Sequence, residues 1–330
     1  MALTGPRRLR VEDQSAVAAV RREAKGMAAS LGFGDTEQEE VAIVATELST
    51  NVLRHAGSGA IVLRPNATTG GLDVLALDQG PGITDLPRAL RDGFSTAGGS
   101  GTGLGAVGRL AAAVDVTATP GRGTAVLARL GGALDGVPAV DGVALPLEGE
   151  AVSGDAWAVV HDGHVSTVLA VDGLGHGEDA ARAAGAAVRE LTPGLSPEEQ
   201  LERMHLALRA TRGAAGAVAR IDRRTGALRF AGIGNISAVT ITGTTAKALP
   251  SNNGTLGSRV GRITAYDRRL EPGSLLVMHS DGARTDWDLT AYPGLLRRDP
   301  LLIAGLLIRD FERGRDDVSA VVARVPLEAA

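Results

Sequence analysis

The feature that most constrains the fold is a segment from Gly131 to about Glu150 that divides the chain into two halves. Apolar residues do not recur in it at a sustained helical or strand period. The segment is rich in Gly, Pro and Asp, a composition typical of linkers. The chain has 330 residues, enough for about two domains that each bury a core of their own. We therefore predict a first domain over 1–130, a linker over 131–150 and a second domain over 151–330.

Hydrophobic spacing predicts helices and strands in both halves. In the first half we expect helices over 13–31, 37–55 and 104–113 and strands over 60–63, 72–77, 114–118 and 124–130. In the second half we expect strands over 157–160, 165–171, 216–221, 227–231, 237–241, 274–279 and 318–325 and helices over 178–191, 196–211 and 300–313. The fold class is α+β, and the many strands of the second half favour a layered β-sandwich with helices outside.

Composition excludes several function classes. The 34 Lys and Arg against 38 Asp and Glu give a net charge of −4, and aromatic residues make up 2%, which argues against a nucleic-acid partner. The absence of Cys excludes disulfides and thiolate metal sites and fits a reducing compartment. The longest strongly apolar stretch, Leu301 to Ile308, is far shorter than the roughly 18 residues that suggest a membrane span. Since the N-terminus also has no apolar signal region, we expect a cytoplasmic protein without a membrane partner.

A polar stripe marks the second predicted helix. Glu47, Asn51 and His55 follow one another at intervals of four residues, so they project from one face of an otherwise apolar helix. Taken alone, a solvated face explains this stripe better than a binding site does. Asp78 follows a predicted strand in the sequence DQGPGI, where a carboxylate can accept a hydrogen bond from an amino group and glycines let a flat ring approach the backbone. Taken alone, DQGPGI is equally well an ordinary turn.

A third segment, from Gly98 to Leu110, is a glycine-rich loop that leads into a helix. Exposed backbone N–H groups and the positive end of the helix dipole would make an anion site suited to a triphosphate. In this order, the three segments resemble the conserved boxes of the histidine-kinase-like ATPase superfamily over about residues 10–130. The sequences TELSTNVLRHA and GTGLGAVGRLA are similar to those of RsbT-type serine kinases. This resemblance implies an α/β sandwich that binds ATP with Mg²⁺.

The resemblance also assigns roles to individual residues. Asn51 would bind the Mg²⁺ that bridges the phosphates, Asp78 would hold the adenine amino group, and Gly80 and Gly82 would shape the floor under the adenine. Glu47 is the candidate general base, because a serine hydroxyl needs a nearby acceptor for its proton during phosphoryl transfer. The residues that would cover the phosphates are Gly101, Gly103, Leu104 and Gly105.

Carboxylates follow or begin predicted strands at four places in the second half. The four motifs are SGDAW with Asp155, VDGLGHG with Asp172, HSDGA with Asp281, and RDDVSAVV with Asp316 and Asp317. Carboxylate oxygens suit Mg²⁺ or Mn²⁺ better than Zn²⁺, and two such ions a few Å apart can bind a phosphate and stabilise its leaving oxygen. Any one of these motifs alone is more often a turn.

Together, the four motifs resemble the PPM family of metal-dependent Ser/Thr phosphatases, in its SpoIIE-like branch, over about residues 150–326. The sequences FAGIGNISAV and SNNGTLG are similar to those of RsbX-type phosphatases. The resemblance implies a β-sandwich flanked by helices that holds two Mn²⁺ or Mg²⁺ ions. Asp172 would bridge them, the Gly173 carbonyl would complete one coordination sphere, and Asp155, Asp281 and Asp316 would be the outer ligands. Asp316 is preferred to Asp317 because the first acid of the motif aligns with the ligand.

The combined resemblance implies a bifunctional regulator of partner switching. One domain would be an ATP-dependent serine kinase and the other a metal-dependent phosphoserine phosphatase, both acting on STAS-domain anti-sigma factor antagonists or stressosome-like phosphoproteins. A sigma factor or a downstream phosphatase is a further partner that the resemblance allows. Two alternatives stay open: the first domain is an ATP-binding module that sequesters a sigma factor or antagonist, or it regulates the attached phosphatase in cis.

Overall fold

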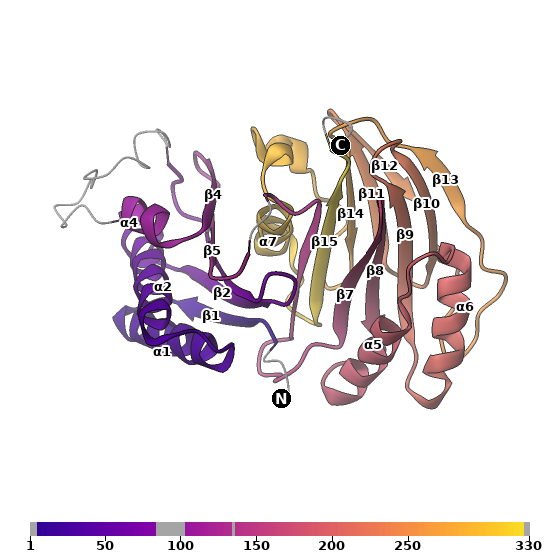
Figure 1. Ribbon diagram of the computed structural model, residues 1–330, viewed down its shortest axis with the longest axis horizontal. Coiled ribbons are helices and arrows are strands. Elements are labelled where there is room, and N and C mark those ends of the chain that lie inside the picture. Colours follow the sequence, from indigo (N-terminus) through magenta and orange to yellow (C-terminus); the bar gives the residue numbers. More distant parts are fainter. Residues whose placement is uncertain (1–4, 84–102, 134–135, 327–330) are drawn as a thin grey trace. The chain divides into compact units, whose positions relative to one another are not determined.

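The computed structural model describes residues 5–83, 103–133 and 136–326. The chain divides into two compact units (Figure 1). Unit 1 comprises Met1–Val137 and Ala291–Arg309, and unit 2 comprises Pro138–Thr290 and Asp310–Ala330. The predicted α+β fold class is confirmed, while the predicted domain boundaries at 130 and 150 stay a prediction.

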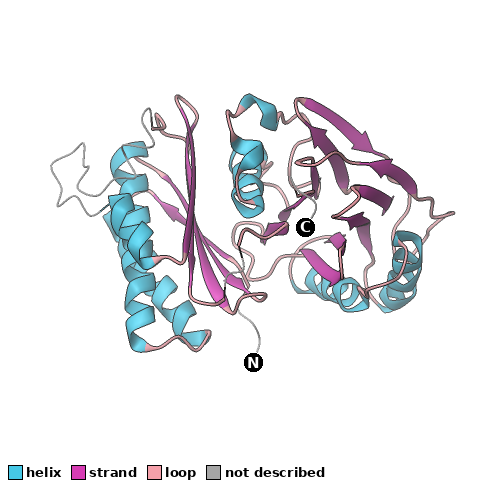
Figure 2. Ribbon diagram, turned by 45° about the horizontal axis from the view of Figure 1, so that its top comes forward, coloured by secondary structure: helices cyan, strands magenta, loops and turns pink. Residues whose placement is uncertain are grey.

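Unit 1 is built on one antiparallel five-stranded sheet, in the order β1-β2-β3-β5-β4. Figures 1 and 2 show α1, α2 and α4 on one face of this sheet and α7 on the other. The described elements are β1 (Arg7–Val11), α1 (Gln14–Ser30), α2 (Asp35–Ala56), β2 (Gly59–Asn66), β3 (Gly71–Asp78), α4 (Gly103–Leu110), β4 (Ala113–Thr119), β5 (Gly123–Leu130), η3 (Leu295–Arg297) and α7 (Pro300–Phe311). The last two residues of α7, Asp310 and Phe311, belong to unit 2.

Helix α2 carries the predicted polar stripe and begins at Asp35, two residues before the predicted range of 37–55. Its N-cap is Gly34, whose N–H donates to Glu37 Oε2 over 2.8 Å. The cap therefore lies before Asp35, which by its residue type is the better N-cap. The apolar side of α2 packs into the core of unit 1 through residues such as Val44, Leu48 and Val52.

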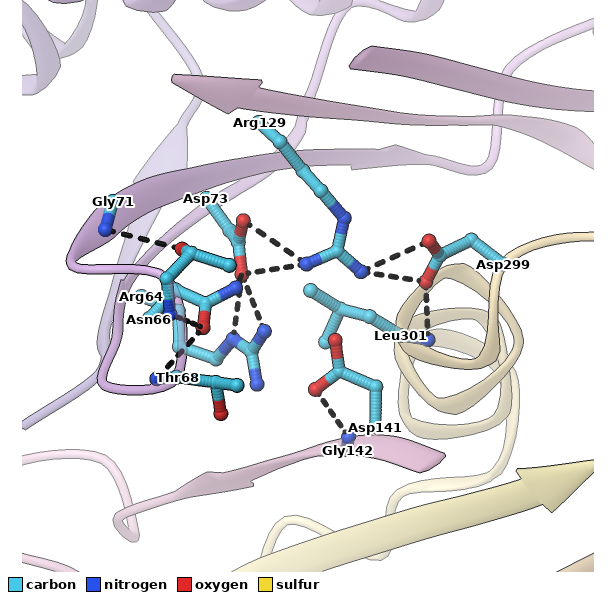
Figure 3. A network of polar contacts seen from close by, with 11 residues as sticks. Arg64, Asn66, Thr68, Gly71, Asp73, Arg129, Asp141, Gly142, Asp299 and Leu301 are labelled. Atoms are coloured by element: carbon cyan, nitrogen blue, oxygen red, sulfur yellow. Dashed lines mark hydrogen bonds and ion pairs between the residues drawn. The ribbon is translucent and has the colours of Figure 1, made fainter. Parts of the chain in front are cut away.

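A row of buried charges crosses the face of the sheet that α7 covers (Figure 3). Arg64, Asp73 and Arg129 lie opposite one another on β2, β3 and β5. Arg64 Nε donates to Asp73 Oδ2 over 3.1 Å, and Arg129 Nη1 lies 3.3 Å from Asp73 Oδ1. Arg129 Nη2 then donates to both carboxylate oxygens of Asp299, just before α7, over 2.8 and 2.9 Å. Acidic and basic side chains thus alternate along the row.

Unit 2 is a sandwich of two five-stranded sheets, β13-β10-β9-β8-β7 and β12-β11-β14-β15-β6. Helices α5 and α6 cover the outer face of the first sheet (Figure 2). The elements are β6 (Val140–Leu145), β7 (Asp155–Asp162), β8 (Val165–Gly173), α5 (Glu178–Glu190), α6 (Pro197–Ala207), η1 (Leu208–Ala210), β9 (Ala214–Asp222), β10 (Ala227–Ile233), β11 (Ser237–Thr242), β12 (Thr245–Leu249), β13 (Tyr266–Arg269), β14 (Leu275–His279), η2 (Leu289–Ala291) and β15 (Val318–Arg324).

Strand β8 shows why the first sheet is apolar on both faces. Val168 and Ala170 point into the layer between the two sheets, whereas Leu169 and Val171 pack under the helices. Successive side chains of a strand point to opposite faces, so a strand covered on both sides reads as a continuous apolar run. The side of α5 that faces the sheet is made of alanines, which let the helix approach closely. None of the helices that the structure describes is long and apolar enough to cross a membrane.

Candidate functional site

Two of the predicted acids lie directly opposite each other in unit 2. Asp155 opens β7, Asp172 lies near the end of β8, and the antiparallel register of the two strands pairs them. Cross-strand partners have Cβ atoms about 5 Å apart, so the two carboxyl groups share one face of the sheet. Asp155 is only 5% exposed, and its Oδ2 atom has no hydrogen-bond partner among the described residues.

The other acids of the second half act on this pair electrostatically. Burial raises the pKa of Asp172 to about 8, and the negative charges of Asp155, Asp281, Asp316 and Asp317 contribute to the rise. Burial likewise raises the pKa of Asp155 to about 7, with contributions from Asp317 and Asp316. The four other carboxyl groups are therefore near enough to Asp172 to disfavour its charged form, an effect that a cation would oppose.

Asp317 and Asp316 have different surroundings. Asp317 is 2% exposed, and its two oxygens accept the backbone N–H groups of Leu147 and Gly154, each over 2.6 Å. Asp317 thereby ties the start of β15 to the loop before β7. Asp316 is partly exposed and accepts the N–H of Asp317 over 2.9 Å. Both oxygens of Asp317 therefore accept backbone N–H groups, and the assignment of Asp316 as the ligand stays a prediction.

Gly173 and His176 lie in the loop that follows Asp172. Gly173 donates its N–H to Gly154 O over 3.0 Å, and a Cβ atom on it would lie 2.3 Å from the carbonyl oxygen of Ala180. Close packing under α5 therefore already requires glycine at this position. His176 is exposed, and its Nδ1 atom lies 2.6 Å from Glu150 Oε1.

The predicted nucleotide residues lie in unit 1, on α2 and at the end of β3. Glu47 and Asn51 are partly buried on α2. Asp78 ends β3, and its Oδ1 atom accepts the N–H groups of Gly80 over 2.9 Å and Thr124 over 3.2 Å. Burial raises the pKa of the Asp78 carboxyl above its usual value, and these two hydrogen bonds oppose the rise. The Asp78 carboxylate thus ties Gly80, just after β3, to Thr124 on β5.

Two glycines of this loop are required by the fold as well as by the predicted role. A Cβ atom on Gly80 would lie 2.6 Å from the Cβ atom of Ala56. Gly82 has a φ of +74°, and a Cβ atom on it would lie 2.5 Å from the carbonyl oxygen of Thr119. Both positions therefore exclude a side chain even without a ligand.

The predicted phosphate-covering residues are described only in part. Gly101 lies outside the described residues, while Gly103, Leu104 and Gly105 form the first turn of α4. Leu104 packs against the core of unit 1. Helix α4 packs beside α2, the helix that carries Glu47 and Asn51.

Family models match both halves of the chain. Residues 11–130 match the model of the histidine kinase-like ATPase domain, and residues 161–326 match that of stage II sporulation protein E, SpoIIE. The second match spans just over half of the chain. The chain belongs to the stage II sporulation protein E family. The predicted fusion of a kinase-like ATPase domain to a SpoIIE-type phosphatase domain is thereby confirmed.

Individual relatives of this SpoIIE-family chain agree with that architecture. The chain is 37% identical over 122 residues to the serine/threonine-protein kinase RsbT of Bacillus subtilis (strain 168). The alignment covers 36% of this chain and 92% of RsbT. A solved structure from work on the bacterial stressosome, described as a modular system adapted to control secondary messenger signaling, is 31% identical with a TM-score of 0.51 and covers 56% of this chain and 98% of that chain. The SpoIIE-family chain is therefore an enzyme of the partner-switching type, in which the ATPase domain implies ATP and the phosphatase domain implies divalent metal ions.

The acids of the SpoIIE-family domain fit such ions by their chemistry. Among the residues that the structure describes, no three His, Cys, Asp or Glu side chains converge closely enough to hold an ion as they stand. The donor set is nevertheless made of carboxylate oxygens, which hard divalent cations prefer, and it includes the orphaned Oδ2 atom of Asp155. The strand pair Asp155 and Asp172 would hold the ions, with Asp281 and Asp316 beside them.

Asn235 is a site residue that is not among those predicted from the sequence. It lies between β10 and β11, and its Nδ2 atom donates to Asp281 Oδ2 over 2.6 Å. The hydrogen bond fixes the orientation of this candidate ligand. The available signal was the sequence FAGIGNISAV, which carries the likeness to phosphatases without revealing what its asparagine contacts.

Substitution Asn235→Ala is expected to weaken Mn²⁺ binding by about 10- to 100-fold, because side chains that orient a ligand have effects of this size. Calorimetric titration with Mn²⁺ measures the change. The matched control is Asn253→Ala, at an exposed position, which is expected to leave the affinity unchanged. Equal affinities for the two variants would contradict the role given to Asn235.

Proposed function

We propose that this protein is a bifunctional enzyme that both phosphorylates and dephosphorylates a serine of a STAS-domain antagonist or a stressosome-like phosphoprotein. The kinase half of the proposal is supported by the identity to RsbT over nearly all of that kinase. The choice of partner is supported by the stressosome structure among the similar chains. Opposing activities on one chain would let a signal set the phosphorylation state of a shared partner.

The observation that carries the phosphatase half is the pairing of Asp155 with Asp172 at one edge of the sheet. Mg²⁺ or Mn²⁺ ions, when bound there, would supply a positive charge that polarises the phosphoryl group and stabilises the leaving serine oxygen. Asp155, Asp172, Asp281 and Asp316 would hold the ions. Asn235 would keep Asp281 oriented, and the backbone contacts of Asp317 would keep the adjoining loops in place.

In the kinase half, the serine oxygen of the partner attacks the γ-phosphorus of ATP while the bond from that phosphorus to the ADP oxygen breaks. The serine proton passes to the carboxylate of Glu47, which acts as general base. Asp78 would accept a hydrogen bond from the adenine amino group, and Asn51 would bind the Mg²⁺ that accompanies the phosphates. The N–H groups that surround Asp78 Oδ1 hold this carboxylate in place.

Incubation with γ-labelled ATP, Mg²⁺ and a STAS-domain protein tests the proposal. We expect labelled serine on the partner, and Glu47→Gln is expected to lower the rate of labelling by about 100-fold or more, since a general base contributes 10²–10⁴-fold. Asp172→Ala is expected to let the label accumulate, because its removal is blocked. Glu40→Gln, on the same helix, is the matched control and is expected to label the partner as the wild type does.

Other results would favour the alternatives. If neither the wild type nor any variant transfers label, and a sigma factor binds in an ATP-dependent manner, unit 1 is a sequestering module and the kinase proposal is wrong. If label is transferred but does not accumulate with Asp172→Ala, the phosphatase acts on a different phosphoprotein.

A further inference from the structure

The segment Ala291–Arg309 belongs to one half of the chain by sequence and to the other by packing. It lies within the SpoIIE family match, yet it is part of unit 1. We propose that this segment is a coupling element through which nucleotide binding to unit 1 changes the turnover of the phosphatase in unit 2. The inference rests on the proposed function, because it needs both a nucleotide site and a phosphatase.

The part of the segment just before α7 is clamped onto β4 and β5. Arg129 on β5 holds Asp299 through two hydrogen bonds, of 2.8 and 2.9 Å (Figure 3). Asp115 on β4 accepts the N–H of Asp299 over 2.7 Å and a hydrogen bond from Arg298 Nη1 over 3.1 Å. Arg129 and Asp299 are both almost fully buried. A charged clamp of this kind holds the segment in one position on the sheet, since a buried charge is costly without its partner.

The middle of the segment lies close against β3. A Cβ atom on Gly305 of α7 would lie 2.3 Å from Leu75 Cδ2. Because glycine disfavours a helix interior relative to alanine, its presence in the middle of α7 indicates that close approach to the sheet is needed. Helix α7 therefore cannot slide over β3 without a change in this contact.

The end of the segment contacts the backbone of the candidate adenine loop. Arg309 Nη1 donates to the carbonyl oxygen of Asp78 over 2.8 Å and to that of Thr124 over 3.3 Å. Gln79 Nε2 donates to the carbonyl oxygen of Arg309 over 3.4 Å. Asp78 and Thr124 are the two residues joined by the hydrogen bond to Asp78 Oδ1. The last turn of α7 thus contacts the backbone carbonyls of Asp78, the candidate adenine-binding residue, and of Thr124, which donates to its carboxylate.

The same segment is continuous with the phosphatase at both ends. The chain enters it from Thr290, after the candidate ligand Asp281, and leaves it at Asp310, before the candidate ligand Asp316. A displacement of α7 therefore pulls on both connections to ligand-bearing loops. Coupling follows if nucleotide binds more tightly to one position of α7 than to another.

Phosphatase turnover on p-nitrophenyl phosphate with Mn²⁺, with and without the β,γ-imido analogue of ATP, tests the coupling. In the wild type we expect the analogue to change kcat by about 5-fold or more, a change as large as the weaker couplings of affinity between two sites. Arg309→Gln is expected to leave the basal kcat unchanged and to reduce the effect of the analogue to less than about 2-fold. Arg262→Gln, an exposed arginine, is the matched control and is expected to behave as the wild type.

Hydrogen exchange supplies a readout that does not depend on activity. In the wild type, the analogue is expected to slow exchange of the amides of Leu301–Ile308 together with those of β3 and β5, because a ligand stabilises the unit that binds it. In Arg309→Gln, β3 and β5 are expected to remain protected by the analogue while α7 is not. Native protection of β3 in this variant also shows that unit 1 is folded.

The outcomes separate this inference from the proposed function. Calorimetric binding of the analogue without any change in kcat or in α7 exchange would overturn the coupling and leave the kinase and phosphatase proposals standing. A full nucleotide effect in Arg309→Gln would overturn the route through α7. Failure of the wild type to bind the analogue would overturn both the coupling and the nucleotide site.

Discussion

Asp172→Asn is expected to lower phosphatase turnover by about 1,000-fold or more, because it removes a carboxylate that would hold the metal ions beside the reacting phosphate. The structure places Asp172 opposite Asp155 and gathers Asp281 and Asp316 near enough to raise its pKa. Turnover on p-nitrophenyl phosphate at saturating Mn²⁺ measures the loss. Calorimetric titration with Mn²⁺ is expected to show a parallel loss of affinity.

The same substitution is expected to stabilise the protein when metal is removed with a chelator. Folding raises the pKa of Asp172 from its ordinary value to about 8, so the folded state holds the proton more tightly than the unfolded state. The contribution of this group to the free energy of unfolding therefore falls as pH rises from about 4 to about 8. At pH 8, Asp172→Asn removes this penalty and is expected to raise the free energy of unfolding by more than about 1 kcal/mol, and below pH 4 to have little effect.

Asp162→Asn is the matched control for both measurements, since Asp162 is an exposed acid at the other end of β7. It is expected to keep both the activity and the metal-free stability of the wild type. Turnover of Asp172→Asn within tenfold of the wild type would show that the metal centre is elsewhere. A loss of metal-free stability at pH 8 would show that the acids do not repel one another as the structure indicates.

The juxtaposition of Asp155 and Asp172 was predictable because it depends mainly on local pattern, whereas their role as metal ligands stays a prediction. Asp155 and Asp172 lie at the outer ends of two strands joined by a short turn, so the hairpin register brings them together. Asn235 was not predictable in this way, since it reaches Asp281 from a different connection of the sandwich. The preference for Asp316 over Asp317 came from the order of the acids in the motif and stays a prediction, while only the fold shows that two backbone N–H groups contact Asp317.

Strand β6 shows a limit of predicting strands from the periodicity of apolar residues. It lies within the segment predicted as a linker, where Asp141 and Gly142 interrupt any alternation of apolar residues. The strand forms by pairing with β15, and a Cβ atom on Gly142 would lie 2.5 Å from the carbonyl oxygen of Ala320. Gly142, one of the glycines that made the segment look like a linker, is therefore the residue that allows it to lie close to β15.

Helix α7 shows a second limit. Its helical conformation was expected over 300–313, but every residue from Pro300 to Ile308 is apolar or glycine and is buried. A helix without a polar face gives no sign of which surface it covers. Its position on the sheet of unit 1 is fixed by the ion pair between Arg129 and Asp299, two residues far apart in the sequence.

Asp73→Ala is expected to lower the stability of unit 1 by about 3–5 kcal/mol, the usual cost of removing one partner from a buried ion pair. Asp73 is 1% exposed and lies between Arg64 and Arg129 on the face of the sheet that α7 covers. Its removal brings two buried guanidinium groups together without the acid between them. Hydrogen exchange of β3 and β5 amides in increasing urea measures the loss.

The two tryptophans supply an internal control for this measurement. Trp157 and Trp287 both lie in unit 2, so their fluorescence reports the unfolding of unit 2 and is expected to change little in Asp73→Ala. Glu190→Ala is the control for an exposed pair, because Glu190 contacts Arg203 at 3.0 Å with both side chains at least 30% exposed. Glu190→Ala is expected to lower the free energy of unfolding by less than about 1 kcal/mol.

Asp73→Asn separates the loss of charge from the loss of packing. The amide keeps the shape of the carboxylate. If Asp73→Ala lowers the stability of unit 1 through lost packing, Asp73→Asn would therefore be as stable as the wild type. If the cause is the lost charge, Asp73→Asn would be destabilised almost as much as Asp73→Ala. We expect the second result, because the burial of two guanidinium groups depends on the negative charge that lies between them. Asp299→Asn is expected to cost less than Asp73→Asn, since Arg129 then still contacts Asp73. Equal stabilities of Asp73→Asn and the wild type would show that the row of charges contributes shape alone.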